Sequence, residues 1–430
     1  MSESVDLLFG KGQLKVQLPD EAQVTLIEKP PMPICSNPDA AVRTALNAPI
    51  GCEPLHELAS GAATACIAIC DITRPVPNHL FLRPIIEALV NAGIALESIT
   101  VVVATGLHRP NEGSELAELI GDPWVLSHVK CENHFANNDE DHVDLGVTPT
   151  RATPIRIDRR FAEADIRIVT GLVEPHFMAG YSGGRKVIAP GLAHADVIRT
   201  FHNHDFMANP DATNCNLDKN PLHEEQLEIV RALGGALAIN TVIDDQRQLS
   251  MVNFGEIVAS HQAAVDFVQE FCRVAVPESF SVVLTSSAGY PLDKTFYQTV
   301  KGICGGIGIC SHGGDLFIAS ECSEGLGSEH YVAAQRALFE RGPSGFLESI
   351  ANKPLADIDA WQTQKQSTAL AQATISLFSK LTEAAAELTG VTCCRTLRDF
   401  EIELAAAIRA SSDQRVAVIP EGPYVIPFVE

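Results

Sequence analysis

The greatest concentration of chemically capable side chains lies in one stretch, Glu174 to His204, which reads EPHFMAGYSGGRKVIAPGLAHADVIRTFHNH. It contains four histidines, whose rings exchange a proton near neutral pH, and one lysine that follows a pair of glycines. Gly183 and Gly184 have no Cβ and let the backbone approach a ligand closely. The loop is not a Walker A loop, because Arg185 separates the glycines from Lys186 and no Ser or Thr follows the lysine. ATP binding is therefore not supported, and we expect other chemistry here.

Two more polar groups each follow an apolar run earlier in the chain. ACIAIC leads directly into Asp71, Thr73 and Arg74, and SITVVVAT leads into Gly106 and His108. An aspartate suits a ribose hydroxyl or a neighbouring cation, whereas the planar fork of an arginine suits a phosphate or a carboxylate. The alternatives are an aspartate that caps a turn beside a surface arginine, and a histidine that is only structural.

These polar groups require strands that end side by side. IRIVTGLV, residues 166–173, reads as a third buried strand, and it runs into Pro175 and His176. Successive apolar strands that end in polar loops indicate a doubly wound sheet, whose ligands bind outside the carboxyl ends of its strands.

The fold class predicted is α/β, with two α/β domains, mostly parallel Rossmann-like sheets and an active-site cleft between the domains. The N-terminal, cofactor-binding domain is expected to cover residues 1–275 and to be completed by residues 411–430. The C-terminal domain is expected to cover residues 276–410. Alternation of apolar and polar residues over 6–28 predicts a hairpin or meander before the main sheet.

A second α/β pattern begins at SVVLTSS, and a helix from about Lys294 should follow it. On that helix Gln298 and Lys301 lie three residues apart and share a face, where they could hold a carboxylate. An exposed lysine on an amphipathic helix is the alternative. Residues from Trp361 to Leu388 predict a long helical region.

Composition narrows the class of protein. The 430 residues, 46% of them hydrophobic, can bury large cores, and a formal net charge of −23 argues against nucleic acid or an anionic membrane as a partner. The twelve cysteines include no C-x-x-C pair, so we expect reduced core residues in a cytoplasmic protein. No apolar run approaches the roughly 18 residues of a membrane span.

The segment 121–165 is polar and mixed, and it places His134 and His142 among acidic and amide residues. Such a pattern could bind a divalent metal, but the spacing of its histidines matches no defined ligand set. We therefore predict a solvated loop region and leave it out of the site.

Taken together, the motifs resemble the lactate racemase family, the nickel-pincer-nucleotide-dependent 2-hydroxyacid racemases and epimerases. The resemblance spans most of the chain. It rests on D-x-T-R-P at Asp71 to Pro75, T-G-x-H-R at Thr105 to Arg109, E-P-H-F-x-A-G-Y-S-G-G-x-K at Glu174 to Lys186, P-G at Pro190, H-N-H at His202, Y-Q-x-x-K at Tyr297 to Lys301, and Trp361.

The resemblance implies a cofactor, a Ni(II) pyridinium-3,5-bisthiocarboxylic acid mononucleotide. In the family it is tethered through a lysine, and a histidine contributes to the nickel site, which implies Lys186 as the covalent tether and His202 as the metal ligand. His204 is not expected to be a ligand, because residues two apart on a helix point to different sides. The residues implied to bind the nucleotide or line its pocket are Asp71, Thr73, Arg74 and Pro190.

The reaction implied is inversion at C2 of a 2-hydroxy acid. The Cα proton beside a carboxylate is weakly acidic, so removing a hydride and the hydroxyl proton to give a planar 2-keto acid is the more accessible route. Each enantiomer then needs a base for its hydroxyl, and His108 and His176 fit those roles. Gln298 and Lys301 would hold the substrate carboxylate, and Tyr297 and Trp361 would shape the pocket.

One position departs from the family pattern. Several members carry an arginine between the Asp and the Thr of the first motif, and this chain has Ile72. Lactate itself is therefore in doubt, and another 2-hydroxy acid is suggested. The partners implied are this small molecule and the cofactor-synthesis proteins that load the enzyme, and a homodimer is left open.

Two other classes of function stay open at this point. One is a metal-dependent hydrolase with His108, His176 and His202 as zinc ligands. The other is a non-catalytic protein that binds an organic anion or a nucleotide.

Overall fold

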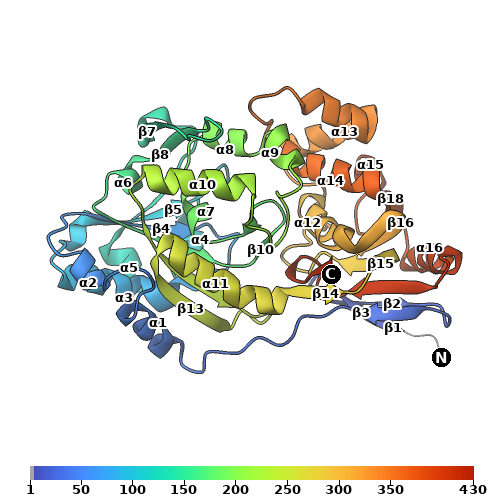
Figure 1. Cartoon of the computed structure of the whole chain (residues 1–430), viewed down its shortest axis with the longest axis horizontal. Helices are drawn as coiled ribbons and strands as arrows, with labels where there is room; N and C mark the ends of the chain where they lie inside the picture. Colours follow the sequence, from blue (N-terminus) through green and yellow to red (C-terminus); the bar gives the residue numbers. More distant parts are fainter. Residues whose placement is uncertain (1–3) are drawn as a thin grey trace. The chain divides into compact units, whose positions relative to one another are not determined.

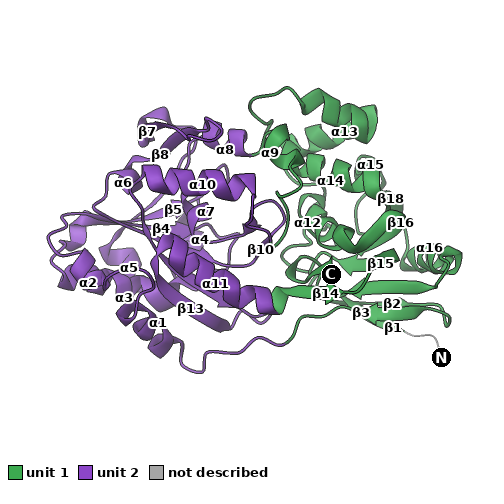
Figure 2. Ribbon diagram, viewed as in Figure 1, with its two compact units in different colours: residues 1–30, 202–215, 271–430 green, residues 31–201, 216–270 purple. Residues whose placement is uncertain are grey.

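The computed structural model describes residues 4–430, and the chain forms two compact units (Figures 1 and 2). Unit 1 consists of Met1–Pro30, His202–Cys215 and Phe271–Glu430, and unit 2 consists of Pro31–Phe201 and Asn216–Glu270. Each unit contains its own six-stranded sheet. The predicted fold class, α/β with mostly parallel sheets, is confirmed.

Unit 2 is built on a sheet in which five strands are parallel and the edge strand β13 is antiparallel. In spatial order its strands are β13 (Leu249–Glu256), β12 (Leu237–Ile243), β9 (Ile166–Leu172), β4 (Ala65–Cys70), β5 (Ile99–Ala104) and β6 (Lys130–Asn133). The remaining strands of unit 2 form two hairpins, β7 (His142–Val147) with β8 (Pro154–Asp158), and β10 (Pro175–His176) with β11 (Gly180–Tyr181).

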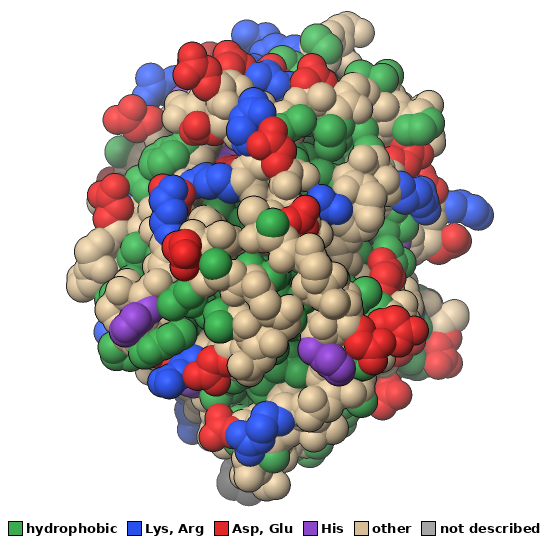
Figure 3. All heavy atoms as spheres, turned by 90° about the vertical axis from the view of Figure 1, so that its left-hand side faces the viewer, with side chains coloured by type: hydrophobic (Ala, Val, Ile, Leu, Met, Phe, Trp, Pro, Cys, Tyr) green, Lys and Arg blue, Asp and Glu red, His purple; other side chains and the backbone are tan. Residues whose placement is uncertain are grey.

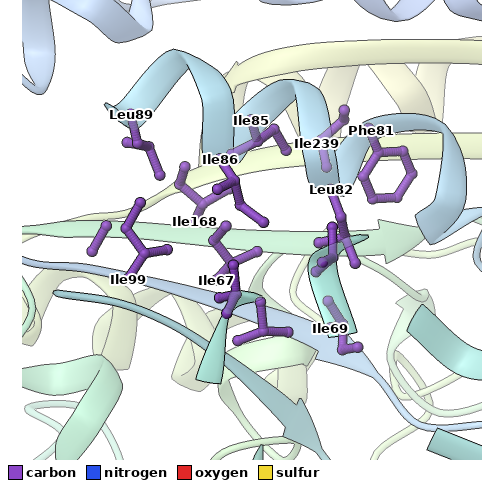
Figure 4. Packing of buried hydrophobic residues seen from close by; sticks show 14 of the residues in the cluster. Ile67, Ile69, Phe81, Leu82, Ile85, Ile86, Leu89, Ile99, Ile168 and Ile239 are labelled. Carbon is purple, nitrogen blue, oxygen red and sulfur yellow. The ribbon is translucent and has the colours of Figure 1, made fainter. Parts of the chain in front are cut away.

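The core of unit 2 forms where helix α3 (Asn78–Asn91) packs on this sheet (Figure 4). Ile67 and Ile69 alternate along β4 and contribute to the same cluster as Phe81 and Ile85 of the helix. All four side chains are fully buried, and each is worth about 1.5–3 kcal/mol relative to an exposed position. This packing fixes the direction of β4 and hence the place where its carboxyl end emerges.

The other helical elements of unit 2 are short, apart from α10 and α11. They are α1 (Pro38–Asn47), α2 (Leu55–Leu58), η1 (Leu96–Ser98), α4 (Gly113–Ile120), α5 (Pro123–His128), η2 (Asp139–Asp141), α6 (Arg159–Ala162), α7 (Arg185–Ile188), α8 (Ala195–Phe201), α10 (Pro221–Ala232) and α11 (Ile257–Cys272), whose last two residues belong to unit 1.

Unit 1 contains a sheet that is parallel throughout. Its strands, in spatial order, are β18 (Thr392–Cys394), β17 (Thr374–Phe378), β16 (Cys310–Ala319), β15 (Phe280–Ser286), β19 (Arg415–Ile419) and β3 (Gln23–Leu26). Two smaller pairs accompany it, β1 (Ser4–Phe9) with β2 (Gly12–Gln17) and β14 (Arg273–Val276) with β20 (Ile426–Val429). The helical elements are α9 (His204–Ala208), α12 (Phe296–Gly306), η3 (Ile307–Ile309), α13 (Glu329–Ile350), α14 (Ala360–Gln372), α15 (Glu383–Glu387), α16 (Leu397–Ala410) and η4 (Gly422–Tyr424).

The predicted N-terminal hairpin is confirmed as β1 and β2, and the strand that follows it, β3, pairs with β19 at the edge of the unit 1 sheet. The prediction of one long helical region from Trp361 to Leu388 was wrong. Helix α14 ends at Gln372, and TISLF then forms strand β17 between β16 and β18. Its Ile375 and Leu377 are fully or almost fully buried, so packing into the sheet decides the structure of this short apolar run.

The prediction of a solvated loop over 121–165 was also wrong. This segment contains β6, β7 and β8, and the two histidines considered as metal ligands, His134 and His142, are buried. His134 contacts Asp158 through Nδ1 at 3.0 Å and the carbonyl oxygen of Ala193 through Nε2 at 3.1 Å. The polarity of His134 therefore serves internal hydrogen bonds rather than solvent.

Charged side chains of both signs are scattered over the face seen in Figure 3, among hydrophobic and other side chains. None of the helices within residues 4–430 combines the length and the apolar character needed to cross a membrane. All twelve cysteines have free thiols.

Candidate active site

Three polar loops of unit 2 emerge next to one another, because β4 lies between β9 and β5 and all three strands are parallel. The loops begin at Asp71, Thr105 and Val173, directly after their strands. The loop after β5 is also bonded to the turn that follows α7, by a hydrogen bond 2.9 Å long from the backbone N–H of Gly106 to the carbonyl oxygen of Gly191. The sheet therefore brings together residues that lie more than a hundred positions apart in the sequence.

Asp71 and His108 form a close polar pair in this region. The carboxylate of Asp71 is buried and lies 2.5 Å from Nδ1 of His108, whose side chain is 63% exposed. The hydroxyl of Thr73 donates to the other carboxylate oxygen at 2.6 Å. Burial alone would raise the pKa of Asp71, but His108, Thr73 and the charge of Arg74 hold it below its usual value. Asp71 is thus an ionised carboxylate that fixes the ring of His108.

His176 is held in a different way, by its own hairpin. It is the last residue of β10, and its Nδ1 accepts hydrogen bonds from the backbone N–H groups of Met178 and Ala179, at 3.3 and 3.2 Å. A nitrogen that accepts from amide donors carries no proton, so the ring proton of a neutral His176 lies on Nε2.

The loop before Lys186 requires its two glycines. Gly183 and Gly184 have positive φ angles of 77° and 49°, which residues with a side chain rarely adopt. A Cβ on Gly184 would lie 2.7 Å from the ring of His261, and one on Gly183 would lie 2.9 Å from Val173. The backbone of this loop therefore packs tightly against its neighbours in unit 2, His261 and Val173. Lys186 follows as the second residue of α7.

Arg185, which lies between the two glycines and Lys186, is 2% exposed. Its guanidinium donates to the carbonyl oxygen of Ala179 at 2.9 Å and lies 3.0 Å from Nε2 of His261. Burial lowers the pKa of Arg185 to about 9 and places that of His261 well below its usual value. The arginine is an internal support of the loop, and sequence reasoning missed that role.

The other nucleotide-binding candidates also lie on these loops. Arg74 forms an ion pair with Glu174, so the first and third loops are linked by charge. Thr73 is exposed, and Pro190 is half-buried at the turn that follows α7. Ile72 lies between Asp71 and Thr73 in the sequence, but its side chain packs against the hydrophobic core of unit 2.

In unit 1 the structure brings together His202, Tyr297 and Trp361. The rings of His202 and Trp361 are 4.5 Å apart, and Nε1 of the tryptophan donates to the hydroxyl oxygen of Tyr297 at 3.2 Å. Burial raises the pKa of Tyr297, so its hydroxyl stays protonated at neutral pH. An aromatic wall thus stands beside the proposed metal ligand.

Helix α12 positions the remaining candidates of unit 1. Thr295 caps its N-terminus by accepting from the backbone N–H of Gln298, and Lys301 follows on the same helix. The side-chain oxygen Oε1 of Gln298 is buried and has no hydrogen-bond partner within residues 4–430. Because an unpaired buried acceptor is costly, this amide is suited to a ligand.

His204 was excluded as a ligand because it was expected to lie on the same helix as His202, and that expectation was wrong. His202 follows the end of α8, and Asn203 caps the start of α9, so His202 and His204 are not two residues of one helix. Both line a cavity of about 10 Å³ with Trp361, and His204 contacts the amide of Gln364 through Nδ1 at 3.2 Å. His204 is already engaged by that amide.

The candidates therefore form two groups, each within one unit. Asp71, Thr73, Arg74, His108, His176, Lys186 and Pro190 belong to unit 2, and His202, Tyr297, Gln298, Lys301 and Trp361 belong to unit 1. Across the described residues 4–430, no three or more His, Cys, Asp or Glu side chains are grouped as a metal site would need.

Sequence reasoning also missed Asn220. Its side chain caps α10 by accepting from the backbone N–H groups of Leu222 and His223, and its Nδ2 donates to the carbonyl oxygen of Met178 at 2.9 Å. The Asn-Pro pair at 220–221 is a helix-start signal that could have identified the cap. The contact with the turn beside His176 could not have been read from it.

Comparison with known proteins identifies relatives over the whole chain. Residues 9–214 match the family described as the lactate racemase N-terminal domain, and residues 276–427 match the lactate racemase C-terminal domain. The sequence is 30% identical to the lactate racemase of Lactiplantibacillus plantarum and 29% identical to that of Thermoanaerobacterium thermosaccharolyticum. Each alignment covers 98% of this chain and 99% of the relative.

Solved structures agree. The lactate racemase apoprotein from Thermoanaerobacterium thermosaccharolyticum matches with a TM-score of 0.90 at 29% identity, over 99% of this chain and 100% of that one. A protein from Thermotoga maritima matches with a TM-score of 0.68 at 15% identity, over 92% and 98% of the two chains, which supports the fold alone.

Proposed function

Because the chain belongs to the lactate racemase family and is therefore an isomerase, we propose that it inverts the C2 centre of a 2-hydroxy acid through a planar 2-keto acid. The product is the enantiomer, or an epimer if the substrate has a second stereocentre. His108 and His176 are the proposed acid and base groups. The observation that carries this proposal is the buried, ionised Asp71 bonded to the largely exposed ring of His108.

That pair gives His108 the properties of a base. An imidazole that donates its Nδ1 proton to a carboxylate keeps the lone pair of Nε2 for a proton from the substrate hydroxyl. The negative charge of Asp71 then stabilises the imidazolium that forms. Positioned proton transfer of this kind contributes about 10²–10⁴-fold to a rate.

The residues present fit the cofactor that the family resemblance implies. Lys186 offers an amine shortly after two glycines whose positive φ angles residues with a side chain rarely adopt. Thr73 and Arg74 offer a hydroxyl and a cation on a neighbouring loop. His202, beside Trp361, offers the imidazole that suits nickel. When bound, the nickel-pincer nucleotide supplies a reversible acceptor for the hydride of C2. Lys186 would hold it covalently, and Asp71 and Pro190 would contribute to its pocket.

The substrate carboxylate is assigned to Gln298 and Lys301, which lie three residues apart on α12. The unpartnered Oε1 of Gln298 can accept a hydrogen bond from a substrate hydroxyl, while its amide nitrogen can donate to a carboxylate. Tyr297 and Trp361 would limit the size of the group carried on C2.

Lactate is the first substrate to test, because both named relatives are lactate racemases. The hydrophobic Ile72 stands where several family members have a cation, and it packs against the core. We therefore propose a 2-hydroxy acid whose side chain needs no cation at this position, and a screen should compare small apolar, acidic and sugar-like acids.

The decisive experiment is peptide mass mapping of Lys186 after co-expression with the enzymes that synthesise the cofactor, in the presence of nickel. We expect a sulfur-containing nucleotide adduct on this lysine and racemisation of at least one 2-hydroxy acid, with deuterium retained at C2. Lys186→Ala should abolish both. Turnover by that variant at the wild-type rate would contradict the covalent attachment.

A matched control is Lys365→Ala, since Lys365 is also a partly buried lysine but donates to the carbonyl oxygen of Ala212. The adduct should persist in this variant. A lysine that stays unmodified while a relative is loaded in parallel would favour the hydrolase and the binding-protein alternatives.

A further inference from the structure

Cys215 and Cys272 lie at the two ends of one excursion of the chain. The chain leaves unit 1 directly after Cys215, passes through unit 2 from Asn216 to Glu270, and returns to unit 1 at Phe271. Cys272 is the last residue of α11, whose end belongs to unit 1 (Figure 2). Both cysteines therefore belong to unit 1, although they lie 57 positions apart in the sequence.

The fold of unit 1 brings the two thiols together. Their sulfur atoms are 3.9 Å apart, and one thiol donates a hydrogen bond to the other. A disulfide bond is about 2.05 Å long, so the sulfurs need to approach by about 2 Å, a shift that rotation of the two side chains can share. Among residues 4–430, no three or more His, Cys, Asp or Glu side chains are arranged to hold a metal ion. The chemistry that suits this pair is therefore oxidation.

The backbone of Cys215 is unusual for a residue with a side chain. Its φ is 55°, in the left-handed region, which such a residue adopts only at a cost and only where its surroundings hold it. The side chain of Asn214 donates to the carbonyl oxygen of Cys304 on α12 at 3.3 Å. The amine of Lys365 on α14 donates to the carbonyl oxygen of Ala212 at 2.8 Å. These bonds fix the end of the segment 202–215 and hold the Cys215 thiol in place.

The two thiols differ in exposure and in acidity. Cys215 is half-buried, whereas Cys272 is only 1% exposed. The hydrogen bond with Cys215, together with burial, raises the pKa of Cys272, so Cys272 keeps its proton. The positive charge of the next residue, Arg273, favours a negative sulfur in the pair. An oxidant from solvent therefore meets Cys215 first, and Cys272 lies behind it as a resolving thiol.

We propose that Cys215 and Cys272 form a reversible disulfide when the protein meets a hydroperoxide, and that this bond ties the segment 202–215 to the start of β14. β14 begins directly after Cys272 and pairs with β20, so the bond has a strand as its anchor. His202, the proposed metal ligand, begins the same segment, and a bond at the other end restricts the backbone that carries it. The site is a modification site and does not depend on the proposed function.

The reaction balances with hydrogen peroxide as the oxidant. The thiolate of Cys215 attacks one peroxide oxygen, the O–O bond breaks, and the sulfur becomes a sulfenic acid. The hydroxide that leaves takes up the proton that the thiol lost and becomes water. The sulfur of Cys272 then attacks the Cys215 sulfur, so the S–S bond forms, the S–O bond breaks, and the hydroxyl leaves with the Cys272 proton as a second water. Each sulfur loses one electron, the peroxide gains two, and a thiol reductant reverses the bond.

The first test maps the thiols of the wild-type protein, so it needs no variant. The full-length protein is reduced, freed of reductant and treated with a small excess of hydrogen peroxide at neutral pH, and free thiols are alkylated before digestion without reductant. We expect two peptides joined through Cys215 and Cys272, together lighter by two hydrogens, and their separation by dithiothreitol. Recovery of Cys215 as an alkylated thiol or as a sulfinic acid, with no joined peptides, would overturn the proposal.

Variants separate the roles of the two cysteines. In Cys272→Ser the sulfenic acid of Cys215 has no resolving thiol, so dimedone should label Cys215 at least about ten-fold more than in the wild type. In Cys215→Ser the buried Cys272 should stay unlabelled. Equal labelling of Cys215 in the wild type and in Cys272→Ser would contradict the resolving role.

Cys35→Ser is the matched control. Cys35 is also half-buried, but its thiol donates to the carbonyl oxygen of Ser250 at 3.4 Å. This variant should form the disulfide as the wild type does. Loss of the disulfide in Cys35→Ser would mean that the joined peptides do not report a specific pair.

Hydrogen exchange of the wild-type protein tests the tether. Residues 209–215 contain turns and no helix, and their amides should exchange at least about ten-fold more slowly in the oxidised form than in the reduced form. Residues 322–328, a loop between β16 and α13, should exchange equally in the two forms. Unchanged exchange at 209–215 would contradict the tether, and equal slowing of both segments would show a general effect of oxidation instead. None of these measurements requires the cofactor.

Discussion

The two sheets place polar residues at the carboxyl ends of their strands, but the residues are used differently. In unit 1 they bond inward: the hydroxyl of Ser286 donates to the carbonyl oxygen of Pro420 at 2.6 Å, and the hydroxyls of Thr299 and Ser320 are 2.6 Å apart. All three side chains are fully buried. In unit 2 the ring of His108 is largely exposed, and its Nδ1 contacts the carboxylate of Asp71.

This difference shows that a polar residue at the end of a parallel strand is not by itself a catalytic candidate. In unit 1 these polar side chains are satisfied by hydrogen bonds within the protein, and the bonds stabilise the fold. In the unit 2 sheet one side of a histidine is fixed and the other side reaches solvent. A site needs both, because an oriented group with no remaining surface cannot meet a substrate.

The largest expected effect is at His108, the exposed member of its pair with Asp71. His108→Gln should lower kcat/KM by about 10²–10⁴-fold, because the base is lost while the fold is not altered. The measurement is the rate of racemisation by the loaded enzyme, with thermal unfolding as the check on folding. His312→Gln is the control, since His312 is an exposed histidine at β16 in unit 1. A similar loss in that variant would remove the contrast between the sheets.

Ser286→Ala should have the opposite effect, a loss of stability with little change in activity. It removes the side-chain partner of the backbone N–H of Ala288 and one of the two hydrogen bonds to the carbonyl oxygen of Pro420, which also accepts from the backbone N–H of Leu8. The free energy of unfolding should therefore fall by about 1–3 kcal/mol. The kcat of the loaded enzyme should stay close to that of the wild type. Denaturant unfolding measures the first quantity, and Ser127→Ala, at an exposed hydroxyl, should change it by less than about 0.5 kcal/mol.

Gln298→Leu tests the one candidate in unit 1 whose polar atom is buried and unpartnered. We expect KM to rise about ten-fold, because a ligand contact worth about 1.4 kcal/mol is lost, while the unfolding temperature stays equal or rises. Gln362→Leu should instead lower the unfolding temperature, since Gln362 donates to the carbonyl oxygen of Tyr297 at 2.6 Å. A fall in stability for both variants would mean that Gln298 is structural.

The last effect appears only at acidic pH and concerns His223, a partly buried histidine on α10. Burial, aided by the charge of Arg185, lowers the pKa of His223 to about 3. The unfolded chain binds this proton near pH 6.5 and the folded chain does not, so stability falls as the pH drops from about 6.5 towards 3. The slope is at most about 1.4 kcal/mol per pH unit for one group, and less for a partly exposed ring.

His223→Gln should therefore flatten the fall in unfolding temperature between about pH 6.5 and pH 4. His56→Gln, at an exposed histidine, should leave that curve unchanged. Parallel curves for wild type and His223→Gln would show that this ring does not contribute to the acid sensitivity.

Much of the unit 2 sheet was predictable from the sequence. The runs ACIAIC, ITVVVA and IRIVTGL are apolar on both faces, as a central parallel strand covered by helices requires, and each is followed by polar residues. The alternation of β1 and β2 gave the hairpin in the same way. Strong local patterns of this kind specify both the element and its end.

Other features depend on partners that are distant in the sequence. TISLF lies within a segment of helical composition and becomes β17 only because β16 and β18 flank it. The polar segment around His134 is buried by contacts with Asp158 and Ala193. In the candidate site, motif residues could be named from the sequence, but the opposite bonding of His108 and His176 could not, because Asp71 and the turn at Met178 must first be brought to them.

The strand β3 has a consequence for biosynthesis. It is made almost at the start of the chain, and its neighbour in the unit 1 sheet, β19, is made almost at the end. During translation β3 stays without β19, its partner strand, until nearly all other elements, including the whole of unit 2, have been made. If a ribosome stalls before residue 415, the unit 2 sheet can form, but the unit 1 sheet lacks β19, the strand between β15 and β3. Such a chain exposes unpaired strand edges, which chaperones bind.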